Sequence, residues 1–221
     1  MTYRILAKLQ AGRKSRISLS APNVSMIGGL FVWPLLCFFL ATARFKSPEP
    51  YVQLPTSSGS GCLKMPEGRL GIISIDKQKR LYFSFDEPYQ SEIIKRVAAR
   101  RRVRFTATQL AELDKMPFLF MDVRQLPWYL SLSLLKRNNI TLLGIPSRLD
   151  NDVDDQLAEC IAAAQSALHD KNGLYPFFSI RADANLEFHE VQRVFTLLQK
   201  HNVNRINLAT IMEEKDSALL F

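Results

Sequence analysis

The sequence predicts one N-terminal transmembrane helix followed by an α/β domain of the two-layer, α+β kind outside the cytoplasm. The evidence is a twenty-residue apolar stretch from Val24 to Ala43, a basic tail before it, and alternating strand-like and helix-like segments after residue 68. A chain of 221 residues is long enough for one medium domain with appendages. Its 47% hydrophobic and 23% charged residues are typical of a folded chain.

The apolar stretch has the length and the flanks of a membrane span. In a helix, twenty residues rise roughly 30 Å, which is the thickness of the hydrocarbon core. No charged residue lies between Arg16 and Arg44, and the tail supplies five of the eight net positive charges. The positive-inside rule then places the N-terminus in the cytoplasm. We therefore assign residues 1–22 to a cytoplasmic basic tail, 23–45 to the transmembrane helix and 46–67 to an extended linker.

A cleaved secretory signal is the alternative, because Ala41-Thr42-Ala43 has the form of a signal-peptidase site. Against it, the stretch is longer than the ~7–15 residues of an ordinary signal core, and Trp33-Pro34 interrupts it. We favour the retained anchor in a bacterial inner membrane. Both interpretations place the remainder of the chain outside the cytoplasm, in the periplasm, where nucleic acid is not an expected partner.

The segment 68–146 is expected to form a first α/β unit. Period-two and helical patterns predict its elements. They are strands at Leu70–Asp76, Leu81–Phe85, Pro117–Val123 and Ile140–Ile145, and helices at Ser91–Arg101, Thr106–Lys115 and Leu126–Asn138.

Residues 147–212 are expected to form a second α/β unit, followed by a tail at 213–221. Its helices are predicted at Asp152–Asp170, with Asp150, Asn151 or Asp152 as the cap, and at Leu186–His201, with Asn202 as a left-handed C-terminal residue. Its strands are predicted at Phe177–Asp183 and Val203–Thr210. Because strand, helix, Asn and strand recur in the same order in both halves, two tandem copies of one unit are a candidate arrangement.

No motif indicates an enzyme, a metal site or a cofactor. The three histidines lie in polar surroundings without the spacing of ligands or a triad, and no phosphate-binding loop or nucleophile elbow is present. A bridge between Cys62 and Cys160 is left open. The densest basic run, from Lys95 to Arg104, is either a solvated helix end or a contact for anionic lipid headgroups or cell-wall polymers.

Two groups of motifs resemble one known family. Near the C-terminus, Ser179-Ile-Arg-Ala-Asp183 ends a strand, Phe188-x-x-Val191 opens a helix, and Asn202 to Thr210 closes the domain. Near the membrane, Asn23-Val24, Thr42-Ala43-x-Phe45 and Val52-x-Leu54-Pro55-x-Ser57 follow at matching spacing. The pattern resembles the ExbD/TolR family over residues 20–60 and 150–212, and it does not account for residues 86–145.

The resemblance implies a membrane subunit of a proton-driven energy-transduction complex for biopolymer or protein transport, with an ExbB/TolQ-type ring protein as partner. It also implies an Asp on the membrane helix, six residues after Asn23, that carries the proton. Here that position is Gly29, next to Gly28. An intramembrane carboxylate is kept where it carries protons or ions, and Gly cannot replace it in that role. Small residues do allow close helix packing.

We therefore expect an auxiliary subunit beside an Asp-bearing paralogue, or a homodimer, inside such a ring. The alternative is an anchored or secreted periplasmic binding or scaffold protein without a motor role. The expected docking segment in the linker is Val52, Leu54 and Pro55, and the expected periplasmic motif is Arg181, Asp183, Phe188 and Val191.

Overall fold

The computed structural model describes residues 32–39, 50–58, 65–147 and 155–212. The chain divides into two compact units, residues 1–46 and 47–221. In the first unit, residues 32–39 are helical and expose large apolar side chains such as Trp33 and Phe39. The rest of the predicted span at 23–45 lies outside the described residues, and among the helices that are described none combines the length and apolarity needed to cross a bilayer.

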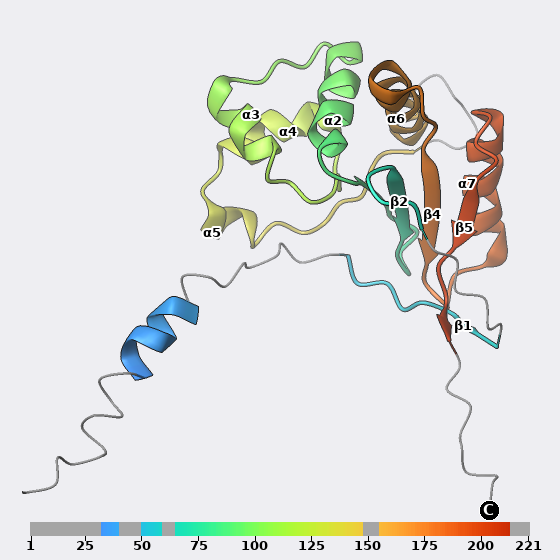
Figure 1. Ribbon diagram of the computed structural model, residues 1–221, viewed down its shortest axis with the longest axis horizontal. Helices are drawn as coiled ribbons and strands as arrows, with labels where there is room; N and C mark the ends of the chain where they lie inside the picture. The colour runs from blue at the N-terminus through green and yellow to red at the C-terminus, as the bar shows by residue number, and fades with distance from the viewer. Residues whose placement is uncertain (1–31, 40–49, 59–64, 148–154, 213–221) are drawn as a thin grey trace, which may run out of the picture. The chain divides into compact units, whose positions relative to one another are not determined.

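The second unit is built on one four-stranded mixed sheet in the order β3-β2-β4-β5 (Figure 1). Strand β2 (Leu70–Ile75) pairs antiparallel with β3 (Leu81–Phe85) and parallel with β4 (Phe177–Ala182), which pairs parallel with β5 (Ile206–Leu208). The β2–β3 hairpin is therefore confirmed, as is a strand after Tyr175. The predicted strand Val203–Thr210 is shorter, at Ile206–Leu208.

Three helices pack along the sheet: α2 (Tyr89–Arg100), α6 (Gln156–Asn172) and α7 (Phe188–Lys200). Helix α6 lies between α2 and α7 and contacts both (Figure 1). Sheet residues of one face, including Ile73 and its cross-strand neighbour Ile180, are fully buried in one core together with Ile93 and Ile161. The predicted mixed α/β domain is confirmed, with helix bounds shifted by a few residues.

The start of α6 corrects one prediction. The cap is Asp155, whose Oδ1 accepts hydrogen bonds from the backbone N–H groups of Leu157 (2.9 Å) and Ala158 (3.3 Å). The predicted caps Asp150, Asn151 and Asp152 lie outside the described residues. The end of α7 agrees with expectation, because Asn202 adopts a left-handed φ of 58°.

The strands predicted at Pro117–Val123 and Ile140–Ile145 are wrong. Each segment contributes one isolated bridge to the edge of β3, Leu119 to Phe83 and Ile145 to Leu81. Prolines 117 and 146 lack the N–H that a longer ladder needs. Gly144 has a φ of +83°, and a side chain there would meet the Cβ of Arg80 at 2.8 Å.

The helix predicted at Leu126–Asn138 is also wrong as one element. The chain forms η1 (Val123–Gln125), α4 (Leu126–Ser131) and α5 (Leu134–Arg137), after the short helix α3 (Ala107–Leu113). The break falls at Leu132, which is extended. The first half of the domain therefore lacks the predicted strand–helix–strand order, and strands from both predicted units, 68–146 and 147–212, share one sheet.

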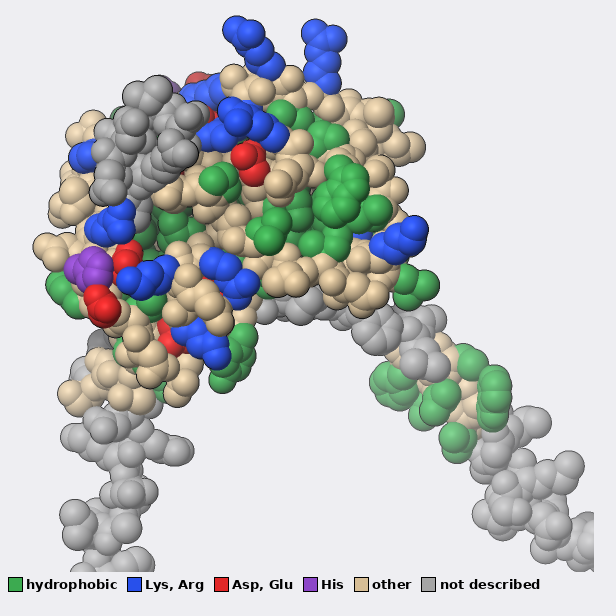
Figure 2. Space-filling model, turned by 180° about the vertical axis from the view of Figure 1, so that it is seen from behind, with side chains coloured by type: hydrophobic (Ala, Val, Ile, Leu, Met, Phe, Trp, Pro, Cys, Tyr) green, Lys and Arg blue, Asp and Glu red, His purple; other side chains and the backbone are tan. Residues whose placement is uncertain are grey.

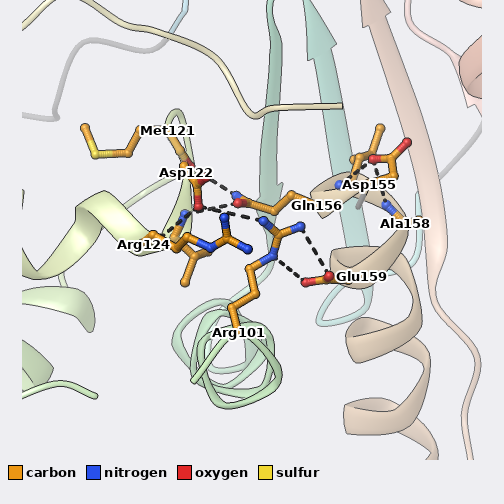
Figure 3. Close-up of polar contacts among 10 residues, drawn as sticks. Arg101, Met121, Asp122, Arg124, Asp155, Gln156, Ala158 and Glu159 are labelled. Carbon is orange, nitrogen blue, oxygen red and sulfur yellow. Dashed lines mark hydrogen bonds and ion pairs between the residues drawn. The ribbon is translucent and has the colours of Figure 1, made fainter. Parts of the chain in front are cut away.

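Polar contacts hold the segment 101–147 against α6 (Figure 3). The Arg101 side chain is almost fully buried, with its Nε 2.8 Å from Glu159 and its Nη1 3.8 Å from Asp122. Gln156 accepts from the Val123 N–H at 3.0 Å and donates to the Met121 carbonyl at 3.1 Å, and all four groups of these two bonds are buried. The buried side-chain amide of Gln156 therefore pairs with the Val123 N–H and the Met121 carbonyl, in a segment that forms no strand.

Replacing Gln156 with Leu should destabilise the domain strongly. The change keeps the side-chain volume but leaves a buried N–H and a buried carbonyl unpaired, which costs about 2–4 kcal/mol of unfolding free energy. Thermal unfolding followed by circular dichroism measures the loss. The matched control is Gln199→Leu on the exposed side of α7, and equal melting temperatures for the two variants would contradict the role of Gln156.

Candidate functional site

The linker segment 50–58 lies against the domain. Strand β1 (Thr56–Ser57) pairs parallel with β6 (Ile211–Met212), and the Ile211 N–H donates to the Pro55 carbonyl at 2.9 Å. Val52 is buried, and Leu54 and Pro55 are half-buried. The three predicted docking residues therefore contact the chain's own domain, in an extended segment whose strand begins one residue after Pro55.

Asp183 is the second half of this site. It follows β4 directly and is 5% exposed. Its Oδ2 accepts from the Gln53 N–H at 3.1 Å, and its Oδ1 accepts from the Asn185 N–H and side-chain amide, both at 3.0 Å. The Ala184 N–H donates to the Gln53 carbonyl at 2.7 Å. One carboxylate thus shapes the β4–α7 turn and fixes the linker to it. We call these contacts of residues 52–57 with Asp183, Ala184 and β6 the linker latch.

These donors lower the pKa of Asp183. The largest contribution comes from the Asn185 backbone N–H, with smaller ones from the Gln53 N–H, the Asn185 side chain and the charge of Lys77. A hydrogen bond to an ionised acceptor is stronger than one between neutral groups. The latch is therefore strongest with Asp183 ionised.

The other predicted residues of the periplasmic motif have separate positions. Arg181 is half-buried on β4 and lines a small cavity with Pro50 and Tyr82. Phe188 is 72% exposed at the start of α7, whereas Val191, one turn later, is buried in the core. The structure thus brings Asp183 to the linker, and it leaves Phe188 on the surface. The membrane-helix residues Asn23, Val24, Gly28 and Gly29 lie outside the described residues.

The sequence did not predict a polar network that joins the β2–β3 turn to α7. Lys79, in the β2–β3 turn, pairs with Glu190 of α7 at 2.8 Å, and Glu190 also contacts His189 (3.2 Å) and Arg193 (3.3 Å). The hydrogen bond from Lys79 is the main cause of the lowered pKa of Glu190. No sequence signal pointed to this pair, because the parallel pairing of β2 with β4 is what brings the two residues together.

The described residues contain no group of His, Cys, Asp and Glu that could hold a metal ion. Cys160 is a fully buried free thiol, and its proposed partner Cys62 lies outside the described residues. Within the basic run, Lys95 pairs with Asp114, Arg96 with Glu92 and Asp170, and Arg101 with Glu159, so much of its charge serves the fold.

Comparison with known proteins agrees with the motifs. A search of curated proteins and a search of solved structures return no match. The family model described as biopolymer transport protein ExbD/TolR matches residues 18–212, which includes the segment 86–145 that the motifs left unexplained. Since this match covers most of the sequence, the chain belongs to the ExbD/TolR family of biopolymer transport proteins.

Proposed function

We propose that the chain is an auxiliary subunit of a proton-driven energy-transduction complex, in which the linker latch is a releasable connection between membrane and domain. In this proposal residues 23–45 cross the inner membrane once, with the N-terminus in the cytoplasm and the domain in the periplasm. Membership of a biopolymer transport family supports the general role. The linker latch is the observation that carries the mechanical part.

The tether length gives the latch a measurable effect. From Ala43 to Val52 the chain can extend roughly 30 Å, at about 3.4 Å per residue. If residues 50–58 leave the domain, the tether runs from Ala43 to Leu70 at the start of β2, and its limit rises to roughly 90 Å. Release would therefore let the domain move several tens of ångströms farther from the membrane without unfolding its sheet.

The latch has a strength that suits release. A hydrogen bond to a charged acceptor such as Asp183 contributes about 1.5–3 kcal/mol. One elementary charge moved through roughly 100 mV supplies about 2.3 kcal/mol. One transported charge therefore matches the Gln53–Asp183 bond, and the other latch contacts, such as the Ala184–Gln53 and Ile211–Pro55 bonds, add to the energy that a few transported protons must supply.

The proton site must then lie in another chain. Gly29 has no titratable group, and no acidic residue lies between Arg16 and Arg44. We propose that an ExbB/TolQ-type ring protein surrounds the helix, and that an Asp-bearing paralogue in the same ring supplies the carboxylate. The Gly28-Gly29 pair would permit close packing against a neighbouring helix.

Co-purification tests this proposal against a periplasmic binding or scaffold protein with no motor role. The full chain, purified in mild detergent, should bring a multi-span ring-forming protein with it, and deletion of residues 1–45 should abolish that association. Retention of the partner after the deletion, or isolation of the full chain without any multi-span protein, would contradict the ring assignment.

Replacing Asp183 with Ala should weaken the latch while the domain stays folded. Loss of the carboxylate removes the acceptor for the Gln53 N–H, worth about 1.5–3 kcal/mol, and should speed exchange of the Gln53 and Ala184 amides by about ten- to hundredfold. Hydrogen exchange of the full chain measures this. Asp114→Ala, which removes a carboxylate that is half-exposed on the surface, is the matched control.

The same exchange should depend on pH. Because the folded-state pKa of Asp183 is lowered, the contribution of its charge is fully present above the ordinary carboxyl pKa of about 4. It is lost as pH falls through the lowered value. Exchange rates corrected for their intrinsic pH dependence should show this loss in the parent chain and not in Asp183→Ala. An equal pH response in the parent chain and in the variant would show that the charge of Asp183 does not hold the latch.

A further inference from the structure

The segment between α2 and α6 contains an apolar cavity that the linker latch does not use. Its volume is about 160 Å³, and it opens between α3, α4 and α5 with Phe118, Phe120, Tyr129 and Leu134 in its walls. Figure 2 shows hydrophobic side chains gathered over this part of the domain. Leu134 is 69% exposed at the cavity.

The walls of the cavity are held in place by specific contacts. The rings of Phe120 and Tyr129 meet edge to face at 5.1 Å, and Phe118 lies 5.6 Å from Phe120. Arg137 donates to the Leu130 and Leu132 carbonyls, which the break between α4 and α5 leaves free, and to Glu112 of α3 at 2.7 Å. The cavity is therefore formed before any occupant binds, which lowers the entropic cost of binding.

The size and the rim of the cavity define its occupant. An apolar space of roughly 150 Å³ accommodates a benzene ring, so this cavity takes one large apolar side chain. The rim is basic. Two of the lining residues, Lys115 and Arg137, are cations, and they share a single carboxylate, Glu112. A fitting ligand is a peptide with a large apolar residue next to acidic ones.

The chain itself contains such a peptide in residues 213–221. Glu213, Glu214 and Asp216, offset by Lys215, give it a net charge of −2, and Ala218-Leu-Leu-Phe221 follows. We propose that an apolar side chain of this segment fills the cavity while its acidic residues lie on the basic rim. The segment that fills the cavity comes from a second copy of the chain. Residues 213–221 follow β6, which pairs with β1, and β1 lies at the side of the domain opposite to α5 and the cavity in Figure 1.

A binding titration tests the cavity. A fluorescent peptide of residues 211–221 is added to a variant of the chain that lacks only residues 213–221. Saturable binding that weakens with added salt is expected. Leu134→Asp, in the cavity wall, should weaken it by at least about tenfold. The matched control is Leu135→Asp on the same helix, where the parent side chain is 80% exposed and does not line the cavity.

The cavity assignment is overturned if the peptide shows no saturable binding, or if the two aspartate variants lose affinity equally. Neither substitution removes a buried group, so both variants should fold. Melting curves of the two variants that match the parent establish this before the titration.

A two-copy experiment tests the source of the segment. One tagged copy carries Leu134→Asp and a photo-crosslinking residue in place of Leu220, and the other copy has an intact cavity and lacks residues 213–221. In this mixture the segment can reach an intact cavity only in the other copy. The crosslink should therefore join the two copies, with the adduct in residues 107–142 of the copy that lacks residues 213–221. If a chain with both parts intact crosslinks solely within itself, the assignment to a second copy is overturned.

Discussion

The parallel pairing of β2 with β4 is the constraint on which the rest of the domain depends. It joins strands whose partner residues, such as Ile73 and Ile180, lie far apart in the sequence. Since parallel strands end at the same edge of a sheet, the pairing brings the residues after both strands together. Those residues are Asp76 and Asp183, and both are buried carboxylates. Two adjacent strand ends therefore carry the two groups that organise the neighbouring loops.

The two carboxylates perform related tasks. Asp76 accepts hydrogen bonds from Arg80 and from the Tyr82 hydroxyl and so fixes the β2–β3 turn, while Arg80 also donates to the Leu142 carbonyl. Asp183 fixes the β4–α7 turn and holds Gln53. The first carboxylate anchors the end of the segment 101–147, and the second anchors the linker. In the proposed function, the first connection is permanent and the second is released under load.

Sequence patterns predicted those parts of the fold in which local and tertiary preferences agree. The hairpin around Lys79, the amphipathic helix α7 and the left-handed Asn202 were all foreseen from residues close in the sequence. The segments 117–123 and 140–145 have strand-like composition but lie at an edge beside prolines, so each makes one bridge instead of a strand. Local pattern does not reveal which segments find a partner strand.

For the candidate site too, the sequence predicted some of the residues but not the contacts between them. Val52, Leu54, Pro55 and Asp183 were named separately from a family pattern, and only the folded chain shows that Asp183 binds the linker through the Gln53 backbone. Every residue except proline has a backbone N–H, so the residue type does not reveal which of them donates to Asp183. Arg101 was placed in a basic run, yet its guanidinium is buried against Glu159.

In the proposed function, the linker latch opens when the complex is energised. The most direct measurement is hydrogen exchange of the Gln53 and Ile211 amides in proteoliposomes that contain the chain and its ring partner, with and without a proton-motive force. Faster exchange is expected at both amides under the proton-motive force, with unchanged exchange at Ile73 in the central strand. Equal protection of Gln53 and Ile211 in both conditions would contradict it.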